Sequence, residues 1–298
     1  MITSIVFSKD RPLQLDLCLN SIKQNLFTDN NIIVLYKTST DDYQKHYNKL
    51  KEEHEDVDFV SQGHNIFENI RNLVRDSSDY VTFFTDDDIV FRPISFKMED
   101  VHNMFHIPYP PGTFSLRMGL NARARDYGDG VHSEDSIPQQ VYKIDGDGEN
   151  FLFWNRTSVP PGGYWSYVFS VDGHIFMKGL MLECCEELAH LYDYHSNRGL
   201  PRAQFAWQNT PNEFEAKLQR FYFNVTPNMA SPEFSCVVNS PNNRVQDHIE
   251  NRSGDKHSFS AEYLLQKFAD GSRIDLDSLN FDGIDCPHTE INIMEGLV

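Results

Sequence analysis

Apolar runs and helix-like segments alternate along residues 1–95, and this alternation constrains the fold more than any other feature of the chain. The apolar runs lie at 2–7, 32–36, 57–60 and 80–84, and the segments with apolar residues at helical spacing lie at 12–26, 43–50 and 66–74. Continuous apolar runs are typical of strands that are covered on both faces. Repeated strand–helix units predict right-handed crossovers, a mainly parallel α/β sheet, and a ligand crevice at the carboxyl ends of its strands.

The pattern changes beyond residue 95. Apolar and polar residues alternate over 114–120 and 165–171, which predicts two half-buried strands. Residues 126–150 are rich in Gly and Asp and predict a long loop or an irregular hairpin. Helical patterns return at 175–191, 213–223 and 261–268. Because no stretch is long enough to link independent domains, we predict one domain with two unequal halves.

The charge of the chain argues against a nucleic-acid partner. Lys and Arg number 26 and Asp and Glu number 44, which gives a formal net charge of −18. Affinity for nucleic acid, in contrast, comes mainly from basic side chains that release counterions. The N-terminus lacks the pattern of a signal peptide, and no apolar stretch reaches the ~18 residues of a membrane span. The 5 cysteines show no CxxC pair, and we expect a cytoplasmic protein without a transmembrane segment.

Three consecutive carboxylates, Asp86, Asp87 and Asp88, directly follow the apolar run at 80–84. Uncompensated charge beside a buried strand is costly, so we expect a positive partner there. Oxygen ligands at a crevice suit Mg²⁺ or Mn²⁺. The alternation of side chains along an extended chain places Asp86 and Asp88 on one side and Asp87 on the other. A solvated acidic turn is the alternative interpretation.

Together these features resemble the GT-A glycosyltransferases, especially their family 2-like group. The resemblance covers residues 1–95 and is carried by the SKDRP loop after the first apolar run, the strand–helix alternation, the Arg71–Asn72 pair and the aspartate triplet. It implies a GT-A-type α/β fold with a mainly parallel nucleotide-binding sheet flanked by helices and a mixed acceptor-side half. Within a single domain over 1–298, it implies a nucleotide-sugar half at 1–95, an acceptor half at 96–235 and a C-terminal lid or helical extension at 236–298.

The resemblance also implies a donor site and a metal. In this family a DxD motif holds a divalent metal that bridges the diphosphate of a nucleotide-sugar donor. The matching positions imply Mn²⁺ or Mg²⁺ held by Asp86 and Asp88, of which Asp88 is the more direct ligand, with His288 returning to the metal or the diphosphate. The implied donor-binding residues lie in the loops after the first two strands, in the third helix and in the triplet: Ser8, Lys9, Arg11, Lys37, Thr38, Asn65, Arg71, Asp86 and Asp87. A surface cation is the alternative for Arg71, and an ordinary core or surface histidine is the alternative for His288.

Two carboxylates in the second half are candidates for a general base. Inverting enzymes of this fold use a carboxylate to deprotonate the attacking hydroxyl. Asp172 follows the alternating segment and precedes Gly173; its alternative role is to cap the helix expected from residue 175. Glu215 is the second candidate, although Asn212 and Glu215 also have the spacing of a capping box. A retaining reaction needs no such base and stays open.

The resemblance therefore implies a metal-dependent glycosyltransferase that inverts the sugar with Asp172 as base. The donor is expected to be UDP-linked, on family frequency, and the acceptor to be a hydroxyl of a glycan or glycoconjugate. A sugar-phosphate nucleotidyltransferase is one alternative, but SKDRP has no Gly for the Gly-rich loop that such enzymes carry after the first strand. A non-catalytic module that binds a glycan or a nucleotide is the other alternative; the intact aspartate triplet argues against it.

Overall fold

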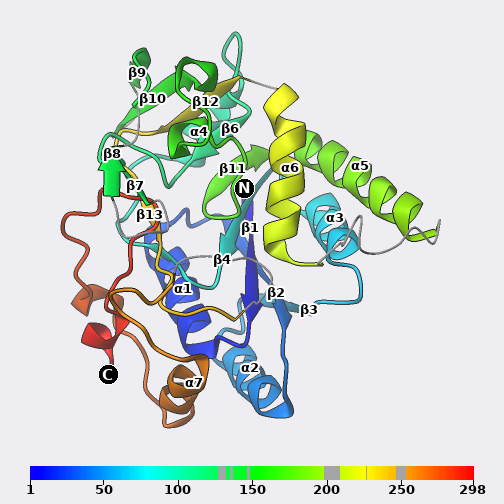
Figure 1. Cartoon of the computed structure of the whole chain (residues 1–298), viewed down its shortest axis with the longest axis vertical. Helices are drawn as coiled ribbons and strands as arrows, with labels where there is room; N and C mark the ends of the chain where they lie inside the picture. Colours follow the sequence, from blue (N-terminus) through cyan, green and yellow to red (C-terminus); the bar gives the residue numbers. More distant parts are fainter. Residues whose placement is uncertain (127–131, 135–136, 146–147, 198–208, 226, 246–252) are drawn as a thin grey trace.

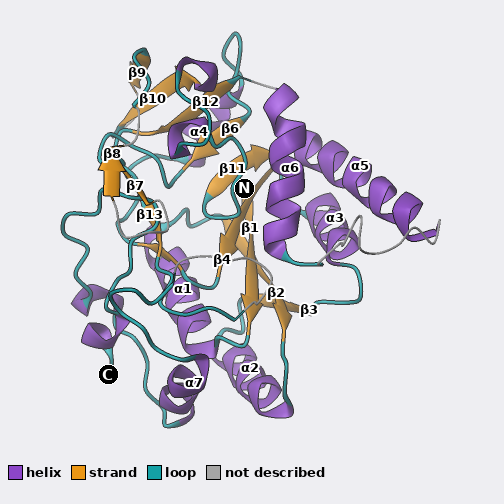
Figure 2. Cartoon of the chain, in the orientation of Figure 1, coloured by secondary structure: helices purple, strands orange, loops and turns teal. Residues whose placement is uncertain are grey.

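A mixed sheet of 9 strands forms the centre of the protein (Figure 1, Figure 2). The computed structural model describes residues 1–126, 132–134, 137–145, 148–197, 209–225, 227–245 and 253–298. Within these residues the strands of the sheet run in the order β3-β2-β1-β4-β11-β6-β12-β10-β9, and helices cover both of its faces. The α/β class that the sequence predicts is therefore confirmed.

The first half of the sheet is parallel and consists of the strand–helix units. Its elements are β1 (Ile2–Lys9), α1 (Pro12–Asn25), β2 (Asn30–Lys37), α2 (Asp41–Glu53), β3 (Asp58–Ser61), α3 (Ile66–Asp76) and β4 (Tyr80–Thr85). β1 pairs in parallel with both β2 and β4, and β2 pairs in parallel with β3. Every element predicted for this half is present, because continuous apolar runs are stable where both faces of a strand are covered.

Two apolar clusters cover the two faces of the sheet. Successive side chains of a strand point to opposite faces, and along β1 Ile2 and Val6 belong to one cluster whereas Ile5 and Phe7 belong to the other. The first cluster includes residues of α1, α2 and α7 (Ala261–Ala269), and the second includes residues of α3, α5 (Lys178–Asn197) and α6 (Pro211–Val225). The helices thus form a layer on each side of the sheet (Figure 1).

The second half of the sheet is mixed, as predicted. It contains β6 (Thr113–Ser115), β9 (Val141–Asp145), β10 (Asn150–Asn155), β11 (His174–Met177) and β12 (Asn228–Pro232). β11 is antiparallel to both β4 and β6 and so joins the two halves. β6 and β12 are parallel, whereas β12, β10 and β9 are successively antiparallel. Across the parts of the chain that the structure describes, no helix is both long and apolar enough to cross a membrane.

A small sheet brings the C-terminal part of the chain to the aspartate triplet. β5 (Asp88–Val90) pairs antiparallel with β13 (Val237–Asn239), and Asn239 lies opposite Asp88 in this register. The remaining elements are α4 (Met98–Phe105) and the antiparallel pair β7 (Ala124–Asp126) and β8 (His132–Glu134). Of the loop expected at 126–150, residues 127–131, 135–136 and 146–147 lie outside the described residues.

The strand expected at 165–171 is not formed. A 3₁₀ turn leads instead into irregular chain, and side chains satisfy backbone groups that a strand would pair. Thr113 Oγ1 donates to the carbonyl of Val168 at 2.6 Å, and the amide of Phe169 donates to Gln219 Oε1 at 2.8 Å. The alternating pattern therefore reports which side chains are buried and not a ladder of backbone hydrogen bonds.

Two further boundaries differ from the sequence-based expectation. The helix expected from residue 175 begins at Lys178, because residues 174–177 form β11 and pair with β4. The strand expected at 114–120 is restricted to β6, and beyond it the chain bonds irregularly, for example from the amide of Leu116 to the carbonyl of Gly173 at 3.0 Å.

Candidate active site

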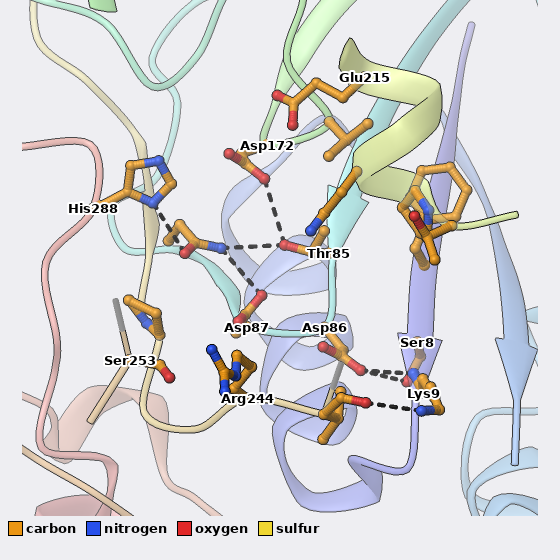
Figure 3. Close-up of a pocket in the computed structure, with 18 of the residues that line it drawn as sticks. Ser8, Lys9, Thr85, Asp86, Asp87, Asp172, Glu215, Arg244, Ser253 and His288 are labelled. Carbon is orange, nitrogen blue, oxygen red and sulfur yellow. Dashed lines mark hydrogen bonds between the residues drawn. The ribbon is translucent and has the colours of Figure 1, made fainter. Parts of the chain in front are cut away.

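A cavity of 660 Å³ lies at the carboxyl ends of β1, β2 and β4. Parallel α/β sheets bind ligands at this edge. Residues from the ends of these strands, among them Ser8, Lys9 and Asp86, form one wall, and Asp172 and Glu215 lie across the cavity from them (Figure 3). The structure therefore brings carboxylates from both halves of the chain into one site.

Arg11 is the positive partner that the aspartate triplet requires. Its Nη1 atom lies 2.8 Å from Asp86 Oδ1 and 2.9 Å from Asp87 Oδ2. The other oxygen of Asp86 accepts hydrogen bonds from Ser8 Oγ at 2.8 Å and from the amide of Lys9 at 3.0 Å. Burial raises the pKa of Asp86 to about 6, a rise that the charge of Arg11 opposes. The sequence predicted a contact of Arg11 with the donor, but not this double ion pair.

The turn between β1 and α1 positions Arg11. Asp10 has a φ of 56°, in the left-handed region that Asp tolerates better than most residues, and its carboxylate accepts hydrogen bonds from the amide and hydroxyl of Ser39 at 2.7 and 2.6 Å. Pro12 then begins α1 at a position where its fixed φ suits the first turn. Arg11 is only 8% exposed, and its Nη2 atom donates to the carbonyl of Asn243 at 2.5 Å.

Asp88 is turned away from the cavity. Its Oδ2 atom accepts from the amide and hydroxyl of Thr85 at 2.7 and 3.2 Å, and its Oδ1 atom accepts from Asn239 Nδ2 at 3.0 Å. Burial, together with the charges of Asp172 and Asp87, raises the pKa of Asp88 above its ordinary value. The expectation that Asp88 is the most direct metal ligand does not match this arrangement, because its oxygens already hold the strand end and β13.

His288 comes close to the site, as expected of a residue returning from the C-terminus, but both of its ring nitrogens are engaged. Nε2 lies 2.9 Å from Arg117 Nη2, and Nδ1 lies 3.1 Å from Asn239 Oδ1. A guanidinium only donates hydrogen bonds. Nε2 of His288 is therefore the acceptor, and Nδ1 carries the proton and donates it to Asn239. This neutral tautomer leaves neither nitrogen free for a metal.

Arg117 is a buried cation of the site that the sequence analysis missed. Its Nη1 atom donates to Asp172 Oδ2 at 2.5 Å and to Ser170 Oγ at 2.6 Å, and its guanidinium carbon lies 5.4 Å from the ring centroid of Tyr164. The alternation over 114–120 assigned Arg117 to the polar side of a half-buried strand, yet it is 3% exposed. The ion pair with Asp172, together with these hydrogen bonds, offsets the cost of burying the charge.

Glu215 lies on α6 and is partly buried in the cavity wall (Figure 3). Burial raises its pKa to about 7; the charge of Asp172 adds to the rise, and Arg117 opposes it. A carboxylate with a pKa near neutrality is suited to accept a proton at physiological pH. The pair Asp172 and Glu215 therefore offers two carboxylates in different environments.

The helix-capping alternatives for these two carboxylates do not hold. Thr210 caps α6, since its Oγ1 atom accepts from the amide of Glu213 at 3.3 Å. The expected pair of Asn212 and Glu215 therefore has no part in this cap. Asp172 is separated from α5 by β11 and so does not cap that helix.

Three residues expected to bind the donor are absent from the described residues that line the cavity. Thr38 Oγ1 donates to Gln44 Oε1 at 3.1 Å. Asn65 caps α3 by accepting from the amides of residues 67 and 68 at 3.0 and 3.3 Å. Arg71 pairs with Glu68 across one turn at 3.8 Å, and its side chain is half-buried on α3.

Other cations line the same cavity. Lys9 donates from Nζ to the carbonyl of Val245 at 2.8 Å, and Lys37 lies at the end of β2. Arg244 is exposed on the cavity wall (Figure 3) and was not singled out from the sequence. Its only signal was its place in the polar stretch at 239–247, of which residues 246 and 247 lie outside the described part of the chain.

The residues present do not fit a divalent metal as they are arranged. Among the described residues, no group of three or more His, Cys, Asp or Glu side chains is placed to hold one. Arg11 occupies one oxygen of Asp86 and one oxygen of Asp87, and Asp88 is held by Thr85 and Asn239.

No protein-family model and no curated protein matches this chain. Solved structures show distant likeness. A fragment of S. aureus TarS in complex with UDP has a TM-score of 0.39 at 14% identity, and covers 61% of this chain and 48% of its own. The mannosyltransferase PcManGT from Pyrobaculum calidifontis, in complex with GDP-Man and Mn²⁺, has a TM-score of 0.29 at 16% identity, and covers 38% of this chain and 34% of its own.

A third structure, the 4-diphosphocytidyl-2C-methyl-D-erythritol synthase from Anaerococcus prevotii, has a TM-score of 0.38 at 12% identity and covers 79% of this chain and 88% of its own. This chain spans about half of the TarS fragment and about a third of PcManGT. Likeness at these values carries no information about chemistry, which has to be inferred from the site itself.

Proposed function

We propose that this chain is a GT-A-type glycosyltransferase that moves a sugar from a nucleotide-sugar, UDP-linked by preference, to a hydroxyl of a glycan or glycoconjugate. The observation that carries the proposal is the composition of one cavity. Polar and cationic residues at the carboxyl ends of the parallel strands, such as Ser8 and Lys9, lie on one wall, and the carboxylates of Asp172 and Glu215 lie across from them. Its 660 Å³ is within the ~300–1,000 Å³ typical of ligand sites.

The two halves of the chain have different tasks in this proposal. The half at 1–95 binds the nucleotide and its diphosphate, and the half at 96–235 holds the acceptor. The C-terminal part, 236–298, supplies Asn239 and His288, which connect the aspartate triplet to Arg117. The division follows the sheet, since the first half is parallel and the second is mixed.

The reaction is a single displacement. The acceptor oxygen forms a bond to the anomeric carbon, the bond from that carbon to the diphosphate oxygen breaks, and the hydroxyl proton passes to a carboxylate of the Asp172–Glu215 pair. Asp172, the base chosen from the sequence, is oriented by Arg117 and Ser170. Burial and the charge of Asp172 raise the pKa of Glu215 to about 7, so Glu215 holds a proton more tightly than a solvated Glu does. The sugar is inverted.

The proposal is tested by following two products in parallel. The protein is incubated with UDP-, GDP-, CMP- and TDP-linked sugars and a panel of glycan acceptors, and separately with sugar 1-phosphates and nucleoside triphosphates. We expect release of the free nucleotide from a nucleotide-sugar, loss of that release in Asp172→Asn and Glu215→Gln, and no effect of Glu187→Gln, an exposed carboxylate on α5. Release of pyrophosphate in the second reaction identifies a nucleotidyltransferase instead. Binding of nucleotide or glycan without any product identifies a non-catalytic module.

A further inference from the structure

We propose that Arg11 takes the place of a divalent cation in the donor site, so that this chain binds the diphosphate of its donor without a metal. The inference rests on the proposed function, because it concerns how the same donor is bound. It begins from one contact: a single nitrogen of Arg11 lies within 2.9 Å of both Asp86 and Asp87. A cation bound by these two carboxylates would need the position that this nitrogen fills.

Arg11 is fixed where it lies. It is 8% exposed, its Nη2 atom donates to the carbonyl of Asn243, and the chain on either side is set by the left-handed Asp10 and by Pro12. Displacing it would leave a buried carbonyl without its donor and would bring a second cation beside a buried guanidinium. Arginine stays charged at any accessible pH, so it cannot give way to a metal by losing a proton.

The remaining aspartate of the triplet offers a metal no alternative. Both oxygens of Asp88 accept hydrogen bonds, from Thr85 and from Asn239, and Asp88 is 1% exposed. Mg²⁺ demands near-octahedral oxygen coordination and gives up its water reluctantly. A cation that could bind only the triplet oxygens not already engaged by Arg11, Thr85 or Asn239 would have few protein ligands.

The charge that a diphosphate needs is supplied by side chains. Arg11 cancels part of the charge of Asp86 and Asp87, and Lys9, Lys37 and Arg244 line the same cavity. The Lys9 side chain is 40% exposed and Arg244 is exposed, so both can reach a ligand. Arg and Lys make charge-assisted hydrogen bonds to phosphate oxygens. Among the described residues of this wall, Lys9, Arg11, Lys37 and Arg244 thus outnumber Asp86 and Asp87 before any metal is added.

The same arrangement explains why three adjacent aspartates are stable here. The cost of uncompensated charge beside a buried strand is the reason to expect a cation there, and Arg11 meets that requirement from within the chain. Asp86 and Asp87 are then structural acceptors that orient Arg11, while Asp88 holds β13 through Asn239.

The test measures nucleotide binding with and without metal. Isothermal titration calorimetry is done with UDP and with GDP on the whole chain, first in EDTA and then with Mn²⁺ or Mg²⁺. We expect one nucleotide to bind in EDTA with a Kd within about threefold of its value with metal, a difference of less than about 1 kcal/mol. We expect Arg11→Gln and Arg244→Gln to weaken binding in EDTA by about 10-fold or more, and Arg75→Gln, an exposed cation on α3, to leave it unchanged.

Binding that is lost in EDTA and restored by Mn²⁺ overturns the inference and leaves the proposed function standing. Absence of nucleotide binding under every condition overturns both. The Arg11→Gln variant lacks a buried charge and need not fold. Mn²⁺ is therefore also titrated into the unaltered protein, and its binding is followed by the electron paramagnetic resonance signal of the ion. We expect no tight site; a stoichiometric site that Asp87→Asn removes contradicts the inference independently of any variant of Arg11.

Discussion

Nη2 of Arg117 lies 2.9 Å from Nε2 of His288, and this contact fixes the protonation of the histidine. Because the guanidinium only donates, His288 accepts at Nε2 and donates from Nδ1 to Asn239. Asn239 in turn donates to Asp88. A continuous set of hydrogen bonds therefore runs from Asp172, the partner of Arg117, to the end of β4. It holds Asp172 and the aspartate triplet in one fixed relation.

Removing the charge of Arg117 is expected to destabilise the fold strongly. Arg117→Met leaves Asp172 buried without its cation, which costs about 3–5 kcal/mol in the free energy of unfolding. Urea unfolding measures this cost. The double variant Arg117→Met/Asp172→Asn is expected to recover part of the loss, because the unpaired carboxylate is gone. Arg75→Met on the exposed face of α3 is the control, and strictly additive losses in the double variant contradict the pairing.

The pH dependence of activity identifies the proton acceptor. A pKa of about 7 for Glu215 means that kcat/KM rises with pH through about 7 and then levels, because the base acts in its ionised form. Glu215→Gln is expected to lower kcat by about 10²–10⁴-fold and to leave nucleotide affinity unchanged, since it lies across the cavity from Lys9. If kcat/KM of the Glu215→Gln variant still rises with pH near 7, the proton is accepted by another group.

The same pKa makes a prediction for stability. Burial raises the pKa of Glu215 from 4.5 to about 7, so the folded protein holds this proton more tightly than the unfolded chain. The resulting stabilisation is present below pH 4.5 and is lost as the pH rises through about 7. Glu215→Gln is therefore expected to unfold at a higher temperature than the unaltered protein at pH 8 and to show a flatter pH dependence. Thermal unfolding from pH 5 to 8 measures this, with Glu187→Gln as the unchanged control.

A pair of glycines tests the packing of the second half. A Cβ added at Gly119 would lie 2.4 Å from the amide nitrogen of Ser235 and 2.6 Å from Cα of Phe234, both backbone atoms. Gly119→Ala is expected to destabilise the protein by about 1–3 kcal/mol. Gly179→Ala is the matched control: nothing lies within 4 Å of its Cβ, and in α5 the alanine is expected to stabilise by about 0.5–1 kcal/mol. Equal effects of the two changes in chemical denaturation would contradict the close approach at Gly119.

The architecture of the first half of the chain, and the residues at its strand ends, can be predicted from the amino-acid pattern. The runs at 32–36 and 80–84 are apolar except for Thr82, a pattern that a strand covered on both faces stabilises, and β2 and β4 lie there. Asp172, which follows the alternating segment at 165–171, and Glu215 were the two carboxylates singled out as candidate bases, and both line the cavity. The strand predicted from the alternating pattern at 165–171 is not formed. The pattern there indicates which side chains are buried, but it does not indicate which groups form hydrogen bonds with the backbone.

The pairing of charges in the site could not be predicted from the sequence, because it depends on how the chain folds. The partner of Asp86 is Arg11, 75 residues away in the sequence, and the partner of Asp172 is Arg117, 55 residues away. Nothing in the local pattern of either arginine indicates which carboxylate it meets, because that depends on the order of strands in the sheet and on the turn at Asp10. Burial in turn sets the pKa of Asp86 and Glu215. Composition supplies the charged groups, but their separation and their exposure to water, which determine their chemistry, exist only in the folded chain.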